Sequence, residues 1–153
     1  QHTDARRAAV AISADDIAGV TGAEVENGGL RLGADSLFDP GKASLKGDRI
    51  PVLDDVAGML KERYPGQKII VEVHTDNEAL EEARDGYQYN IQLGLQRAAN
   101  VFKYLNLKHG IPEERVAIFS SGTGKLPSAE PAGSGQGKRK NRRVVFRLSA
   151  HSY

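Results

Sequence analysis

Two long stretches with the apolar spacing of amphipathic helices alternate with short β-branched runs along this chain of 153 residues. Apolar side chains recur every three or four positions over 50–64 and again over 87–109, which predicts two helices. The other apolar runs are of strand length and lie at 30–34, 68–74, 116–120 and 142–148. This order favours helices packed on a mixed sheet. We therefore expect an α/β sandwich (α+β) with about four strands in a mixed sheet and two long helices on one face.

Glycines separate the first 29 residues from this pattern. Residues 5–18 are rich in alanine and able to form a short helix, but four glycines interrupt the following segment. We expect a leader or linker over 1–29, partly helical, then a domain over 30–149 and a C-terminal tail over 150–153. The chain begins at Gln1 and has no signal-peptide pattern, so we expect a mature or excised fragment.

The composition excludes several classes of function. The chain has no cysteine, which rules out thiolate metal sites, disulfides and cysteine nucleophiles. The basic run at 138–143 has no interleaved aromatic residues, so nucleic acid is not an expected partner. His74 and Asp76 fall short of a metal-ligand set, and no serine, histidine and aspartate follow the order of a triad motif. We expect a binding domain, not an enzyme, with no metal and no cofactor.

Polar residues that packing does not explain gather at strand ends and on one helix face. Asn90, Gly94 and Arg97 are four and three positions apart, so they share a face of the second helix. We expect a different face of this helix to enter the core, through the apolar stripe Ile91, Leu95, Ala98, Phe102 and Leu105. The polar face predicts a ligand-binding site.

Four motifs agree in order with one known family. Leu37-Phe38-Asp39 with Leu45 is similar to its opening strand and turn, and Val73-His74-Thr75-Asp76 to its Gly-His-Thr-Asp signature. Residues 90–101 are similar to its Asn-x-x-Leu-Ser-x-x-Arg-Ala-x-x-Val helix, and Asn141-Arg142-Arg143-Val144 to its closing strand. Over roughly 30–148 the chain therefore resembles the OmpA C-terminal family, which includes OmpA, Pal and MotB.

The resemblance implies a non-covalent site for the diaminopimelate residue of the peptidoglycan stem peptide. Arg97 would offer a guanidinium fork to the ligand carboxylate, and Asp76 would accept from its ammonium group. Asn90 would add an amide that both donates and accepts. Such a domain would anchor an envelope protein or complex to the cell wall.

The same resemblance extends the site and places the protein. Asp39 would lie near the mouth of the site, Arg143 would reinforce carboxylate binding from the last strand, and Thr75 belongs to the signature. Peptidoglycan is the expected partner, with envelope proteins as further partners and the periplasm or cell envelope as the location. No apolar run approaches the roughly 20 residues that span a bilayer, so any membrane anchor of the full-length protein, or its secretion, would depend on other segments.

The chain departs from the family pattern at three places. Val73 stands where the signature has glycine, Gly94 stands where the helix has serine, and an acidic insertion occupies Glu78–Tyr89. These departures support an alternative, a structural or protein-interaction domain that has lost or altered the peptidoglycan site.

Simpler roles remain open for four of the singled-out residues. Asp76 and Arg97 could form a structural salt bridge, and Asn90 could be a helix-start residue. Because side chains alternate along a strand, only one of Arg142 and Arg143 can face the site.

Overall fold

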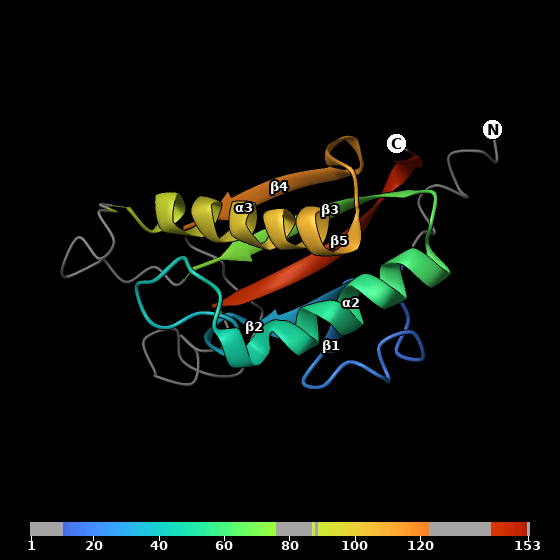
Figure 1. The fold of residues 1–153 in the computed structure, drawn as a ribbon, viewed down its shortest axis with the longest axis horizontal. Coiled ribbons are helices and arrows are strands. Elements are labelled where there is room, and N and C mark those ends of the chain that lie inside the picture. The colour runs from blue at the N-terminus through green and yellow to red at the C-terminus, as the bar shows by residue number, and fades with distance from the viewer. Residues whose placement is uncertain (1–10, 76–86, 88, 123–141, 153) are drawn as a thin grey trace.

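The fold is a mixed sheet covered on one face by two helices (Figure 1). The computed structural model describes residues 11–75, 87, 89–122 and 142–152, and in this part of the chain the sheet has five strands in the order β1-β2-β5-β3-β4. The strands are β1 (Glu24–Glu26), β2 (Gly29–Gly33), β3 (Gln67–His74), β4 (Val116–Ser121) and β5 (Arg143–Ser152). β3 and β4 are parallel, whereas the other neighbouring strands are antiparallel. The expected fold class is confirmed, with five strands in place of about four.

The additional strand comes from a hairpin at the start of the described chain. Glu26 pairs with Gly29, and the two residues between them, Asn27 and Gly28, have φ angles of 48° and 79°. Positive φ at both central residues is the geometry of a type I′ turn, and Asn-Gly is its preferred sequence. The glycines here were expected to be breaks, but Gly28 and Asn27 form the turn of a hairpin.

The packed fold begins before the expected domain boundary at Leu30. Ile12, Ile17 and Val20 are buried in the same core as the sheet, and the Ile12 amide donates to the Gly28 carbonyl at 2.8 Å. β1 also lies within the segment expected to be a leader, and at the other end β5 continues through residues expected to form a tail. Much of the predicted helix at 5–18 lies outside the described residues, and 14–19 form turns.

Helices α2 (Ile50–Arg63) and α3 (Asn90–His109) supply the second layer. α2 has proline in its first turn, where the missing amide hydrogen costs no hydrogen bond. α3 ends at Gly110, which has a φ of 69° and donates to the carbonyls of Asn106 and Leu105. Neither helix in the described chain combines the length and apolar character needed to span a bilayer.

The core lies between the helices and one face of the sheet. Alternate side chains of the three central strands point into it, because successive residues of a strand face opposite sides. The fully buried strand residues on this side are Leu30, Leu32, Ile69, Val71, Val73, Val144 and Phe146. Two short 3-10 turns, η1 (Ala34–Ser36) and η2 (Gly47–Arg49), bound the loop that leads from β2 to α2, and a third, η4 (Glu113–Arg115), precedes β4.

The buried stripe of α3 differs from the predicted one. Its members are Leu93, Gly94, Arg97, Ala98, Val101 and Leu105. The prediction was right for Ala98 and Leu105 but wrong for Ile91 and Leu95, which are 51% and 48% exposed. α3 carries two adjacent apolar stripes, and periodicity alone does not say which one meets the sheet.

Candidate ligand-binding site

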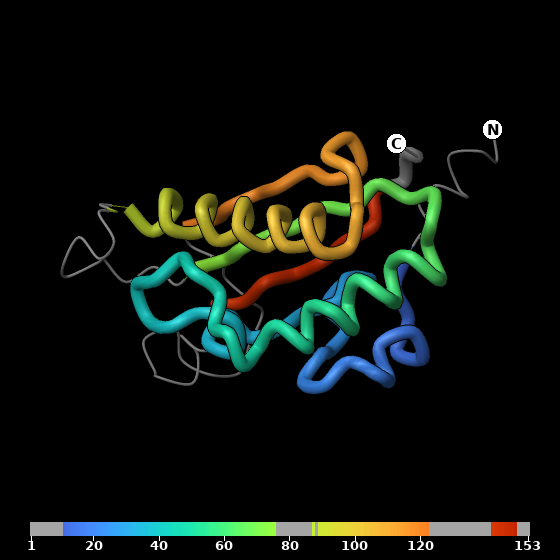
Figure 2. Tube along the Cα trace, viewed as in Figure 1, coloured from blue at the N-terminus to red at the C-terminus, as the bar shows by residue number. Residues whose placement is uncertain are grey.

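Arg97 ties α3 to the loop between η1 and η2, which passes beside the first half of this helix (Figure 2). The Arg97 Nε donates to the Lys42 carbonyl at 2.8 Å, and Nη2 donates to the Asp39 carbonyl at 3.1 Å. The guanidinium carbon also lies 4.8 Å from the centre of the Phe38 ring, within the range of a cation–π interaction. Arg97 is only 4% exposed, so its contacts hold residues 39–42 in one position.

Asn100 holds the same loop and was not among the predicted site residues. Its Nδ2 donates to the Ala43 carbonyl at 2.8 Å, and its Oδ1 accepts from Gln96 at 3.0 Å. The exposed side chain of Asp39 lies 3.5 Å from the Lys46 ammonium. Asn100 follows Arg97 by three positions, a spacing that places both on one side of a helix and could have indicated a shared role.

The end of β3 is fixed by Thr75. Its amide and its hydroxyl both donate to the Ser121 carbonyl, at 3.0 and 3.2 Å. Thr75 is 4% exposed and is the last described residue before the gap. Asp76 and most of the Glu78–Tyr89 insertion lie outside the described residues. The structure therefore defines where the chain leaves the sheet toward Asp76.

Asn90 is the first residue of α3 and is half-buried. A Cβ atom built on Gly122 would lie 4.0 Å from the Asn90 Cβ, so the start of α3 lies beside the end of β4. Thr75 reaches the same place through Ser121. Arg97 is seven residues further along α3, a rise of about 10 Å. α3 thus connects the ends of β3 and β4 with the Asp39 loop, and it brings Thr75, Asn90, Arg97 and Asp39 to one end of the fold.

Arg143 lies on the other side of the sheet. Its neighbour Val144 faces the helices, so Arg143 points to the opposite face. There its Nε and Nη2 donate to the two carboxylate oxygens of Glu26, at 2.8 and 3.1 Å. Arg142 pairs with Asp35 in η1 at 2.9 Å. The structure does not bring Arg143 together with Arg97.

The pair of Arg143 and Glu26 belongs to a larger network on this face, which we call the ion-pair face. Arg147 donates to Glu72 at 2.8 Å and lies 3.3 Å from Glu26, and the His74 Nε2 lies 3.0 Å from Glu72. Burial acts to raise the pKa of Glu72, but the hydrogen bond with His74 and the positive charge of Arg147 outweigh it and lower this pKa below 4.5. The carboxylates on this face are matched by neighbouring cations.

Two of the departures from the family pattern lie against each other. A Cβ atom built at Gly94 would lie 3.5 Å from Val73 Cγ1, and it would come too close to the Ser120 Oγ. That hydroxyl donates to the Ile91 carbonyl at 2.8 Å. Relative to the family pattern, a smaller residue on α3, Gly94, thus faces a larger residue on β3, Val73. The helix therefore remains close to the sheet.

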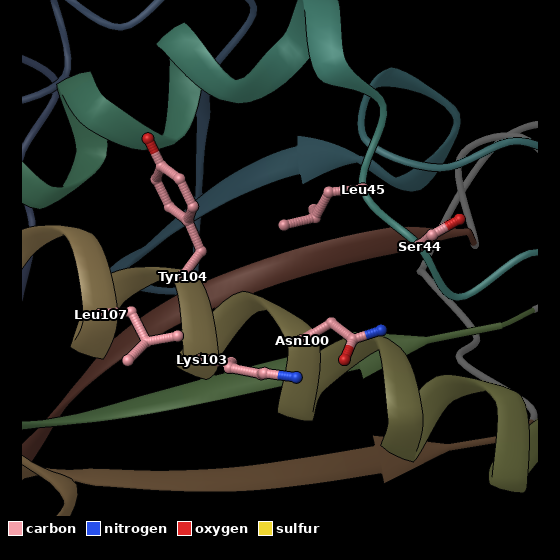
Figure 3. Close-up of a pocket in the computed structure, with 6 residues that line it drawn as sticks. All are labelled: Ser44, Leu45, Asn100, Lys103, Tyr104 and Leu107. Carbon is pink, nitrogen blue, oxygen red and sulfur yellow. The ribbon is translucent and has the colours of Figure 1, made fainter.

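A shallow hollow continues from the Asp39 loop along α3 (Figure 3). Its volume is about 310 Å³, and its lining residues are Ser44, Leu45, Asn100, Lys103, Tyr104 and Leu107. The Tyr104 hydroxyl donates to Asp54 of α2 at 2.5 Å. In the described ranges, no three His, Cys, Asp or Glu residues are grouped so as to hold a metal ion.

The fold is an α/β sandwich in which a helix carries a buried arginine that is hydrogen-bonded to a loop. The chain belongs to the OmpA family, whose model matches residues 37–142. It is 35% identical over 115 residues to outer membrane protein A of Bordetella avium, covering 75% of this chain and 54% of that protein. It is 32% identical over 96 residues to the peptidoglycan-associated lipoprotein of Rhizobium meliloti, covering 63% and 50%. The chain thus spans about half the length of these relatives.

A solved structure extends the likeness to the whole fold. The cell wall anchor of the type VI secretion system from Pseudomonas aeruginosa superposes with a TM-score of 0.72 at 25% identity. The match covers 90% of this chain and 94% of that one. The five-stranded sheet and its two helices therefore correspond to an architecture known from a wall anchor.

Proposed function

We propose that this chain binds peptidoglycan without a covalent bond, through the diaminopimelate of the stem peptide, and anchors an envelope protein or complex to the cell wall. The site would comprise Asp76, Arg97, Asn90, Asp39 and Thr75. The observation that carries the proposal is the convergence, along the first two turns of α3, of the Asp39 loop and the end of β3. Family membership supports it, as do a wall-associated relative and a structurally similar wall anchor.

The ligand chemistry fits the charges of this site. The free end of diaminopimelate presents a carboxylate and an ammonium group on one carbon. An arginine and an aspartate at fixed positions bind these groups in only one direction, because their charges are opposite. The contacts of Arg97 with the Asp39 loop would keep the guanidinium in place before the ligand arrives, which reduces the entropy lost on binding.

Arg143 has a different role in this proposal. Its bidentate pair with Glu26 on the ion-pair face would stabilise the sheet instead of contacting the ligand. The site would bind its ligand without catalysing a reaction, as expected of a wall-anchoring domain of this family. Peptidoglycan as the ligand places the domain in the periplasm or cell envelope.

Co-sedimentation with purified sacculi tests the site. We expect the wild-type chain to be retained, and Asp76→Ala and Arg97→Ala to weaken retention by at least tenfold, because each removes one of the two charges. Glu24→Ala, an exposed change on β1, is the control and should be retained like the wild type. Circular dichroism would confirm that all four proteins are folded. Equal retention of all four would contradict the proposed site, and no retention of the wild type would favour the alternative of a protein-interaction domain.

Competition tests the proposed ligand. Free diaminopimelate should displace the chain from sacculi, whereas lysine should not, because lysine has the same spacing between its two amino groups but lacks the second carboxylate. Displacement by both compounds at the same concentration would show that the site does not recognise the second carboxylate of diaminopimelate. The assignment of diaminopimelate as the ligand would then be wrong.

A further inference from the structure

Lys103 carries a positive charge that the described chain does not use. It lies on α3, is exposed, and lines the hollow beside the Asp39 loop. Within the described residues, its ammonium group has no hydrogen-bond or ion-pair partner. Figure 3 shows this ammonium group pointing along the hollow toward Asn100. A negatively charged group that enters the hollow would therefore meet a cation without a competing partner.

The surroundings of the hollow do not neutralise this charge. α3 has three lysine or arginine residues and no aspartate or glutamate. Asp54 of α2, which accepts from the lining residue Tyr104, also lies 2.6 Å from the His109 Nε2. Asp39 lies 3.5 Å from the Lys46 ammonium. Because these two carboxylates already have partners, the positive charge of α3 makes the hollow favourable for an anion.

The rest of the lining is largely apolar. Leu45 of the loop and Tyr104 and Leu107 of α3 contribute to it, and Leu107 is 76% exposed. A lysine can lay its methylene groups on such a surface and keep its ammonium group in water. Figure 3 shows Tyr104 and Leu107 at one end of the hollow and Asn100 toward the other. The hollow therefore suits a carboxylate on a short apolar segment better than a free anion.

The hollow continues from the proposed diaminopimelate site. Asn100 lines it and binds the Asp39 loop, which also binds Arg97. Lys103 is six residues beyond Arg97, a rise of about 9 Å along α3. In the stem peptide, a γ-linked glutamate precedes diaminopimelate and keeps a free α-carboxylate. This carboxylate is roughly 10 Å from the free end of diaminopimelate, because about nine covalent bonds separate them. The ligand thus carries an anion at about the spacing of the two cations on α3.

We propose that Lys103 is a specificity-determining residue, which binds the α-carboxylate of the glutamate that precedes diaminopimelate. This inference rests on the proposed function and extends the recognised part of the stem peptide from one residue to two. The methylene groups of the glutamate would lie on Leu45 and Leu107. An exposed ion pair contributes about two- to fivefold in affinity. That contribution distinguishes a stem peptide with a free α-carboxylate from one in which this group is an amide.

Two synthetic tripeptides test this proposal. One is L-alanyl-γ-D-glutamyl-diaminopimelate, and the other has the α-carboxylate of its glutamate converted to an amide. Isothermal titration calorimetry at low salt should give the wild type a dissociation constant about fivefold lower for the acid than for the amide. Lys103→Gln removes the charge and should bind the two tripeptides equally. Lys61→Gln, an exposed change on α2, is the matched control and should keep the preference.

The ratio of the two dissociation constants separates this inference from the proposed function. If the wild type binds neither tripeptide, the proposed function is wrong and the role of Lys103 fails with it. If the wild type binds both tripeptides equally, or if Lys103→Gln keeps the preference, the diaminopimelate site stands and the assignment of Lys103 is overturned. An equal loss of preference in Lys61→Gln would also overturn it, because the effect would then come from the net charge of the domain.

Discussion

Arg97 and Arg143 are buried to the same extent, with 4% of each exposed, but they lie on opposite sides of the sheet. Arg143 pairs with the carboxylate of Glu26, whereas Arg97 contacts two loop carbonyls and an aromatic ring. A carboxylate neutralises the charge of a buried arginine, whereas carbonyl oxygens hold the guanidinium group in one orientation. The comparison indicates that burial alone does not reveal the role of a buried charge, and that the chemistry of the partner does.

The largest effect is expected from Glu26→Ala, which removes a carboxylate shared by Arg143 and Arg147. Loss of one partner of a buried ion pair costs about 3–5 kcal/mol, because the remaining charge stays desolvated. Urea denaturation would measure this change in the free energy of unfolding. Glu24→Ala removes an exposed partner of Arg31 and should cost less than about 1 kcal/mol. Similar losses for the two variants would show that the ion-pair face is not buried as described.

The next effect compares the two arginines directly. Arg97→Lys keeps the positive charge but cannot make both loop contacts, so we expect sacculus binding to fall at least tenfold. Arg143→Lys should lower the free energy of unfolding by about 1–3 kcal/mol through its lost bidentate pair and leave binding within twofold. Co-sedimentation and urea denaturation of both variants would separate the roles. A comparable loss of binding in Arg143→Lys would return this residue to the ligand site.

A smaller effect is expected in the packing of α3 on β4. Gly94→Ala gains about 1 kcal/mol of helix propensity, but its methyl group displaces the Ser120 hydroxyl from the Ile91 carbonyl. In a Ser120→Ala background this conflict is absent, so Gly94→Ala should be stabilising there. A double-mutant cycle in urea should yield a coupling energy of about 1 kcal/mol. Additive effects would mean that the two side chains do not compete for one space.

The smallest expected effect is an acid sensitivity of the ion-pair face. The pKa of Glu72 is held below 4.5 in the folded chain, so its ionised form contributes stability above that pH and loses it as the pH falls through the folded-state pKa. Urea denaturation between pH 7 and pH 3 should show a shallower decline for Glu72→Gln than for the wild type. Glu113→Gln, an exposed change outside the face, serves as the control and should match the wild type.

Local patterns account for most of the predicted fold. The helix at 50–63 and the strand at 67–74 follow from apolar periods of 3.6 and 2, which depend only on neighbouring residues. The resemblance of four ordered motifs to the OmpA family implied the roles of Asp39, Thr75, Asn90 and Arg97, which lie toward one end of the fold. Asn100 was missed although it follows Arg97 by three positions, because the carbonyl that it binds belongs to a residue 57 positions away.

The sequence by itself determined the two helices, four of the five strands and their order, because apolar spacing is a local property, and its ordered motifs indicated the family. Only the tertiary structure decided that Arg143 pairs with Glu26, a residue 117 positions away, and that Ile91 and Leu95 remain outside the core. It also placed Gly94 against Val73. Each of these outcomes depends on which segments become neighbours in space. Burial of apolar surfaces against one another determines these neighbours, and the spacing of residues along the chain does not.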